Sequence, residues 1–198
     1  REDTLELLRS VYAESSEDEL LEMMNYIKKR KDEEMMGGYS SHGKRKNKNL
    51  AKKAAVYLRK ASGPRVAVFE VNGFDTHAAQ GGVNGTHTEC LVEMDDIIKN
   101  LKINLKEAYK DTIILTVTEF GRTIKQNGGN GTEHGYGTAI FMAGGLLKKS
   151  QVYTDWPGLK RKELFDGRDL NATIDARSVY ASAMSTVFDL DFNRIQKE

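Results

Sequence analysis

The stretch "DTIILTVT", residues 111–118, is a nearly continuous apolar run of the kind that forms a strand buried on both faces of a sheet. An earlier stretch, "PRVAVFEV" at residues 64–71, is rich in β-branched residues and ends at a turn, so it predicts another strand. Between them, apolar residues recur at helical spacing from Cys90 to Ala108. Strand, helix and strand make a βαβ unit, which predicts two parallel neighbours joined by a right-handed crossover.

The chain after this unit predicts a third strand and a closing helix. Residues 120–136 are glycine-rich and lack a helical pattern, and "GTAIFMAGG" at residues 137–145 then reads as a strand. Because a parallel return needs a crossover that is usually helical, we expect this strand to return antiparallel. A helix is expected to begin near Asp175. The predicted fold class is α/β, with a mixed, mostly parallel sheet and flanking helices.

The first 49 residues differ in character from the rest. Residues 4–31 have a helical pattern, and residues 32–49 are polar and aperiodic. A basic cluster in the latter lacks interleaved aromatic residues, so it indicates a solvated loop; it comprises Lys44, Arg45, Lys46 and Lys48. The sequence therefore predicts a helical arm and basic loop over residues 1–49, and an α/β domain over residues 50–198. The arm either packs within the protein or docks on a partner.

The overall composition excludes several classes of partner. Thirty basic and twenty-nine acidic residues leave a net charge of +1, so no whole-chain field favours nucleic acid or an anionic membrane. The longest apolar run falls short of the roughly 18–20 residues that span a bilayer. Cys90 is the only cysteine, which excludes an internal disulfide and a thiolate cluster.

Polar side chains gather where the predicted strands end. Asp75 and His77 follow the first strand, and Glu119 follows the second; in open α/β sheets, ligands bind outside these carboxyl ends. An antiparallel third strand would begin on the same edge and bring His134 there. Carboxylate and imidazole donors suit zinc first, with manganese or iron as alternatives, and the absence of thiolates favours a catalytic over a structural site.

Arg122 lies three residues after Glu119 and is a candidate for anion binding. Its guanidinium has the geometry to hold a phosphate, sulfate or carboxylate in a bidentate manner. Plainer alternatives exist for each residue. The Asp-x-His pair is also a turn device, Glu119 is also a partner for Arg122 or a lysine, and His134 also suits an exposed surface.

Four short stretches together resemble a known family. They are "FEVNGFDTH" at residues 69–77, "TVTEFGRT" at 116–123, "NGTEHG" at 130–135 and "FMAGG" at 141–145. In order and spacing they are similar to the C-terminal half of the domain of unknown function 1501 family, a bacterial group placed in the alkaline phosphatase and sulfatase superfamily. The usual family strings are close to "GGWDTH", "SEFGRT", "GTDHG" and "AGG".

This resemblance implies an α/β/α sandwich with a one- or two-metal site, usually zinc, that hydrolyses small anionic phosphate or sulfate esters. By position, Asp75 and His77 stand for the superfamily's Asp-His ligand pair at a shorter spacing, and His134 stands for its late histidine. Glu119 stands where an Asp-His pair is expected, with Phe120 in place of that histidine. The superfamily nucleophile belongs to an N-terminal half, so the resemblance implies a truncated chain whose partner is that half, and a periplasmic or secreted location.

The sequence leaves two functions open. One is a metal-dependent hydrolase of phosphate or sulfate esters that uses the four candidate ligands and Arg122. The other is a non-catalytic exported binding module on the same fold, which holds an anionic ligand or a partner at its glycine-rich edge. Metal content separates the two.

Overall fold

A computed structural model describes residues 42–191 of the 198-residue chain. The chain divides into two compact units, residues 1–43 and residues 44–198, and the domain boundary predicted after residue 49 stays a prediction. The helical arm predicted at the N-terminus lies outside the described residues, and the fold below is that of residues 42–191. Its elements are α3 (His42–Leu58), α4 (Thr86–Leu105), η1 (Lys106–Asp111), β1 (Ile114–Leu115), β2 (Gly121–Arg122), β3 (His134–Gly135), β4 (Met142–Ala143), η2 (Arg161–Glu163) and α5 (Ala176–Phe188).

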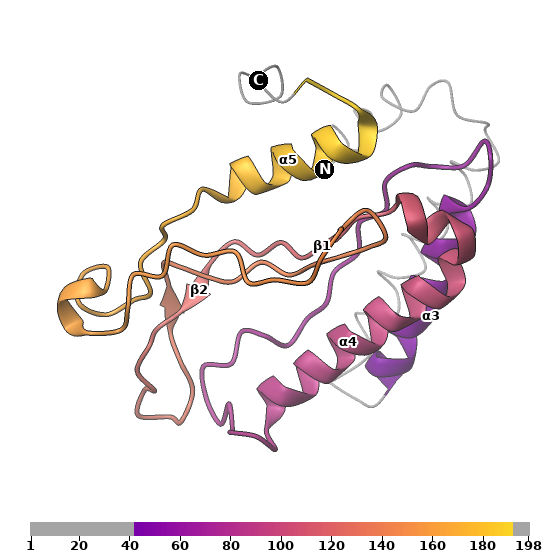
Figure 1. Ribbon diagram of the computed structural model, residues 1–198. Coiled ribbons are helices and arrows are strands. Elements are labelled where there is room, and N and C mark those ends of the chain that lie inside the picture. The colour runs from indigo at the N-terminus through magenta and orange to yellow at the C-terminus, as the bar shows by residue number, and fades with distance from the viewer. Residues whose placement is uncertain (1–41, 192–198) are drawn as a thin grey trace, which may run out of the picture. The chain divides into compact units, whose positions relative to one another are not determined.

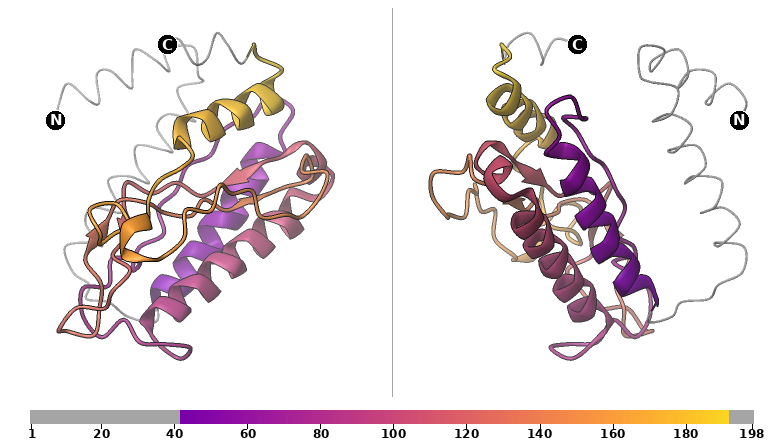
Figure 2. Two further views of the ribbon diagram at one scale, coloured as in Figure 1. Left: turned by 60° about the vertical axis from the view of Figure 1, so that its left-hand side comes forward. Right: turned by 90° about the vertical axis from the view of Figure 1, so that its right-hand side faces the viewer.

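Helices α3 and α4 lie side by side and form the hydrophobic core (Figure 2). Small alanines on α3 let the apolar stripe of α4 approach closely, and burial of this stripe stabilises both helices. The amphipathic helix expected to run to Ala108 is confirmed, although its α-helical part ends at Leu105 and η1 follows. The buried core residues are Ala51, Ala55, Ile97, Leu101 and Leu105.

The prediction of a loop over residues 32–49 is wrong for residues 42–49. Helix α3 already begins at His42, so the basic cluster lies within a helix. Lys48 forms an ion pair of 2.6 Å with Asp96 of α4, and Asn47 donates a hydrogen bond of 2.7 Å to Glu93. Packing against α4 supports a helix that the local polar composition does not indicate, because most helical stability in proteins comes from tertiary contacts.

Residues 64–71, which the sequence predicts to be a strand, form no ladder with another segment among the described residues. Their side chains alternate, since Phe69 and Val71 pack against the helical core whereas Val68 is 92% exposed. The second predicted strand, residues 111–118, was expected to be buried on both faces. Only Ile114–Leu115 forms a strand there, and Val117 is exposed. The strand pairing predicted for these two segments is therefore limited to β1 in the described residues.

The antiparallel return of the third predicted strand is confirmed. β4 pairs antiparallel with β1, with Ile114 opposite Ala143 and Leu115 opposite Met142. The extended segments around β1 and β2 lie between α5 on one side and α3 and α4 on the other (Figure 1). Both ladders in the described part of the chain are antiparallel. The mostly parallel sheet of an α/β/α sandwich therefore stays a prediction.

The closing helix begins where the sequence predicts. Asp175 is the N-cap of α5, and its side chain accepts a hydrogen bond of 2.9 Å from the backbone N–H of Arg177. Ala181 and Ala183 are the buried residues of this helix. Among residues 42–191, no helix has the length and apolar character needed to cross a membrane.

Candidate metal centre

Two loops that are distant in sequence pair through their backbones. The loop after the extended segment, residues 72–80, meets the glycine-rich loop at residues 127–135. The backbone N–H of Thr132 donates to the carbonyl of Thr76 at 3.0 Å, and that of Ala79 donates to the carbonyl of Gly129 at 2.9 Å. These bonds hold the two loops in one register and bring their side chains to one place.

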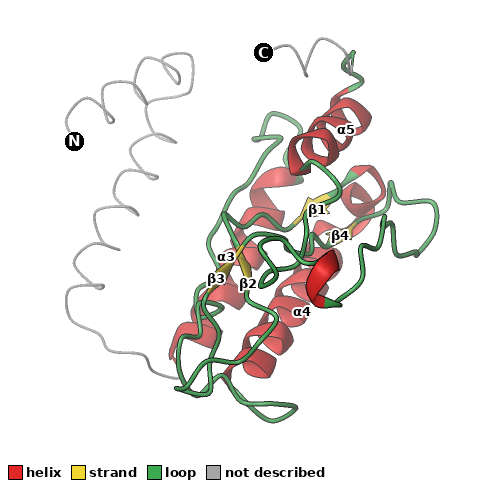
Figure 3. Ribbon diagram, turned by 90° about the vertical axis from the view of Figure 1, so that its left-hand side faces the viewer, coloured by secondary structure: helices red, strands yellow, loops and turns green. Residues whose placement is uncertain are grey.

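The short ladder of β2 and β3 completes the site (Figure 3). These strands are antiparallel, with Arg122 directly opposite His134. Directly opposed residues project to the same face of a ladder, so the two side chains lie beside each other. Phe120, just before β2, stacks on the ring of His134 with centroids 3.9 Å apart and planes inclined by 15°.

Asp75, His77 and His134 form a compact cluster of metal-ligating atoms. Oδ1 of Asp75 lies 2.9 Å from Nε2 of His77 and 3.1 Å from Nε2 of His134. The two Nε2 atoms are 3.1 Å apart. All three side chains are about half exposed, so the cluster is open to solvent.

The dimensions and donors of this cluster fit a transition metal. A tetrahedral zinc ion with ligand distances of about 2.0–2.1 Å holds its ligand atoms about 3.3 Å apart, close to the separations observed here. Two imidazoles and a carboxylate also match the three protein ligands that catalytic zinc sites use. Facing lone pairs repel one another, so either a ring N–H hydrogen or a metal ion must lie between these atoms.

Glu133 orients His77 from the side opposite the cluster. Its Oε2 lies 2.9 Å from Nδ1 of His77, and its other oxygen accepts a hydrogen bond from Asn127. The hydrogen bond from Asn127, followed by that from His77, lowers the pKa of Glu133 below its ordinary value. Because an ionised carboxylate can only accept, Nδ1 carries the hydrogen and Nε2 faces the cluster. Metal-binding histidines have such a carboxylate partner in many sites.

Arg122 places a positive charge directly on Asp75. Its Nη1 donates to Oδ1 of Asp75, while its Nε donates to the hydroxyl of Thr132 at 2.9 Å. Desolvation by itself raises the pKa of Asp75, but hydrogen bonds from Arg122 and His134 outweigh it, so the pKa lies below its ordinary value. The carboxylate is therefore ionised, with Arg122 as its cationic partner.

A buried polar layer supports the exposed cluster. Thr76 and Thr132 are both buried, and each hydroxyl donates to Oε1 of Gln80, at 2.8 and 2.7 Å. Because every one of these buried groups has a partner, the layer fixes the two loops without the cost of unsatisfied polar atoms. The two loops that carry the exposed cluster are therefore joined by buried side-chain hydrogen bonds.

A protein-family model described as "Protein of unknown function (DUF1501)" matches residues 3–194 of the chain. The chain belongs to this family. Searches of the curated proteins and of the solved structures each find no match.

In this DUF1501 protein, the structure unites most but not all of the predicted site residues. Asp75, His77 and His134 meet in the cluster, and Arg122 contacts it through Asp75. Glu119 is exposed, lies outside the cluster and has no hydrogen-bonding or ionic partner among residues 42–191. Phe120, the next residue in the chain, does contact the cluster, because its ring stacks on that of His134.

Sequence reasoning missed the residues that support the DUF1501 cluster. Glu133, Asn127 and Gln80 were assigned no role, although each makes side-chain hydrogen bonds at the site. A carboxylate directly before a candidate histidine was the available signal for Glu133. Asn127 before a glycine-rich turn was a weaker signal, since asparagine commonly accepts backbone N–H groups in such turns. Its Oδ1 does so here from Gly129 and Gly131, both at 2.9 Å.

Replacement of Glu133 by glutamine is expected to weaken zinc binding about 10- to 100-fold. Glutamine keeps the shape of the side chain but lacks the charge that holds the hydrogen on Nδ1 of His77. Competition with a chromophoric chelator measures the affinity. Glu119→Gln removes a carboxylate that lies outside the cluster and should leave the affinity unchanged. A stronger effect of Glu119→Gln than of Glu133→Gln would mean that the metal uses a different ligand set.

Proposed function

We propose that this protein is a metal-dependent hydrolase of phosphate or sulfate esters, with Asp75, His77 and His134 as its metal ligands. The observation that carries the proposal is the meeting of two Nε2 atoms and one carboxylate oxygen within 3.1 Å of one another. A bound zinc ion, or manganese or iron in its place, supplies a Lewis acid that polarises an ester oxygen and lowers the pKa of water.

The protein groups around the ligands have distinct roles in this function. Glu133 holds the tautomer of His77, and the stacked ring of Phe120 fixes the plane of His134. Arg122 supplies positive charge at the position where an anionic ester would approach Asp75. Its Nε and one Nη are held by Thr132, so the guanidinium is oriented before any ligand binds. Orientation in advance is what makes electrostatic stabilisation effective.

The described residues offer no activated hydroxyl nucleophile. Thr76 lies between two cluster residues in sequence, but it is buried and its hydroxyl donates to Gln80. The proposal therefore relies on water, or on a nucleophile from an N-terminal half of the domain. It also includes the wider relationship that the motifs suggest: the chain is the C-terminal half of an alkaline phosphatase-like domain, with an α/β/α sandwich in the complete protein and a periplasmic or secreted location.

Metal analysis combined with an ester assay tests the proposal. The purified protein should bind zinc in a one-to-one ratio and hydrolyse 4-nitrophenyl phosphate or 4-nitrophenyl sulfate only when metal is present. Asp75→Asn should abolish both properties. Asp155→Asn, the same change at an exposed aspartate outside the cluster, should affect neither. Hydrolysis that survives complete removal of metal would refute the proposal.

A specific contact favours a second candidate function, the non-catalytic binding module. Arg122 already pairs with the carboxylate of Asp75, and Glu133 already contacts Nδ1 of His77. The cluster then needs no metal, and the glycine-rich edge around it holds an anionic ligand or a partner. A metal-free protein that keeps its stability when Asp75 and His134 are replaced would support this second function.

A further inference from the structure

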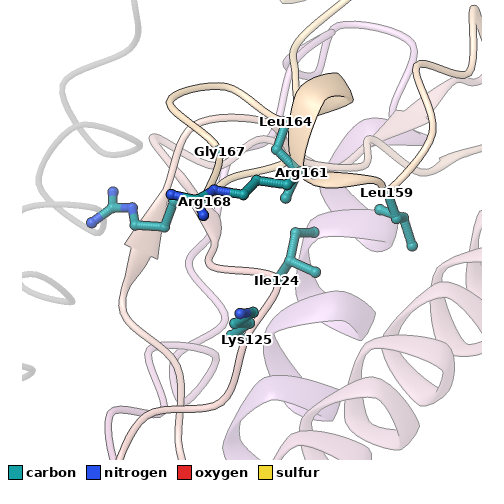
Figure 4. A pocket seen from close by; sticks show the side chains of 7 residues that line it. All are labelled: Ile124, Lys125, Leu159, Arg161, Leu164, Gly167 and Arg168. Carbon is teal, nitrogen blue, oxygen red and sulfur yellow. The ribbon is translucent and has the colours of Figure 1, made fainter.

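A pocket with a volume of about 350 Å³ opens beside the segment that follows β2 (Figure 4). One part of its lining is apolar and another part is basic. Pockets from about 300 Å³ upward hold small-molecule ligands in proteins. The apolar lining consists of Ile124, Leu159 and Leu164, and the basic lining consists of Lys125, Arg161 and Arg168.

Lining residues of this pocket contact the segments that carry the metal cluster. The backbone N–H of Ile124 donates to the carbonyl of Arg168 at 3.4 Å, which ties the end of β2 to the pocket loop. An Nη of Arg168 donates in turn to the carbonyl of His134, also at 3.4 Å. A cluster residue and a pocket residue are thus in direct contact. Ile124 also lines the pocket only two residues after Arg122, the residue that contacts Asp75 of the cluster.

The pocket carries positive charge that the protein does not neutralise. Arg168 is paired with the carboxylate of Asp169, whose side chain is only 4% exposed, and its guanidinium points away from the other lining side chains (Figure 4). Lys125 and Arg161 have no ion-pair partner in the described part of the chain. No lining side chain is acidic. Two free cations beside apolar surface favour a ligand that is both anionic and apolar.

We propose that this pocket binds the organic part of the substrate, a single ring or similar apolar body that carries an anionic group of its own. The inference rests on the proposed hydrolase function, which places the ester group of the same molecule at the cluster. In the reaction, the oxygen of water bonds to phosphorus or sulfur, and the bond from that atom to the organic oxygen breaks. The organic oxygen takes up the proton, so an anionic alcohol or phenol is released from the pocket.

Benzenesulfonate is a suitable probe because it has a ring and an anionic group but no ester to hydrolyse. Calorimetric titration of metal-free protein should show saturable binding. Lys125→Gln removes one cation and Leu159→Asp adds a repelling charge; each should weaken binding about tenfold or more. Leu159 is 51% exposed, so its replacement leaves the core intact. Absence of saturable binding would overturn the inference.

Matched controls exist for both changes. Lys149→Gln and Val152→Asp alter exposed residues outside the pocket and should leave the affinity unchanged. An equal loss in these controls would mean that benzenesulfonate responds to overall charge only, which also overturns the inference. Binding that is lost in the pocket variants alone supports it.

Hydrolysis of two esters separates this inference from the proposed function. With metal present, 4-sulfophenyl phosphate should have a higher kcat/KM than phenyl phosphate, and Lys125→Gln should remove the difference. Equal kcat/KM values for both esters in the unchanged protein would refute the role of the pocket while the hydrolase function stands. Lys125-dependent binding of benzenesulfonate without hydrolysis of either ester would refute the hydrolase function and support the ligand class assigned to the pocket.

Discussion

A His134→Ala variant is expected to lose zinc binding, with the affinity falling by more than about 100-fold. Removal of a supporting residue costs about 10- to 100-fold, and loss of one of only three protein ligands costs more. The variant also loses the ring that stacks on Phe120 and the Nε2 that approaches Asp75. Competition with a chromophoric chelator at neutral pH measures the change.

His87 provides the matched control for this variant. It lies in the first turn of α4, outside the cluster, and its Nδ1 makes no hydrogen bond among the described residues. His87→Ala should therefore leave the zinc affinity unchanged, although it removes the edge contact with Phe74. A comparable loss of affinity in both histidine variants would show that the Asp75–His77–His134 cluster is not the metal centre.

Gly131→Ala is expected to destabilise the protein by about 3 kcal/mol, which corresponds to a decrease in melting temperature of about 6–12 °C. A Cβ at this position would lie 2.2 Å from the carbonyl carbon and 2.4 Å from the oxygen of His77. Both atoms belong to the backbone, so they cannot move aside as a flexible side chain would. The loops must separate, and zinc affinity should fall together with stability.

Gly128 lies in the same loop and is the control for Gly131. A Cβ there would meet nothing within 4 Å, so Gly128→Ala should change stability by less than about 1 kcal/mol. Thermal unfolding followed by circular dichroism compares the two variants. Equal melting temperatures would contradict the close contact between Gly131 and the backbone of His77.

The helices were the most predictable part of the fold. The apolar stripe of α4 and the Asp175 cap of α5 are local signals, and the structure has a helix at each place. The strands were less predictable because the same apolar run is compatible with several partners. Residues 64–71 were predicted to be a strand but form no ladder in the described chain, whereas β1 and β4 pair antiparallel as expected.

The candidate site was partly predictable, because residue types are visible in the sequence but their contacts are not. Asp75, His77 and His134 stand out by residue type and by their position beside turns, and they do meet. Glu119 stands out equally by sequence, yet it remains outside the cluster. Glu133 was passed over, although it contacts His77 directly. Residue type identifies candidate ligands, but it does not tell which of them face a common point.

The sequence alone determined the helical stripe of α4, the cap of α5 and the types of donor available for a metal, because each depends on residues close together in the chain. The tertiary structure decided which donors meet. Backbone hydrogen bonds between residues 76–80 and 129–132, and the tight fit of Gly131 against His77, join loops that are fifty or more residues apart. Their closure depends on contacts across the whole fold, which no local pattern encodes.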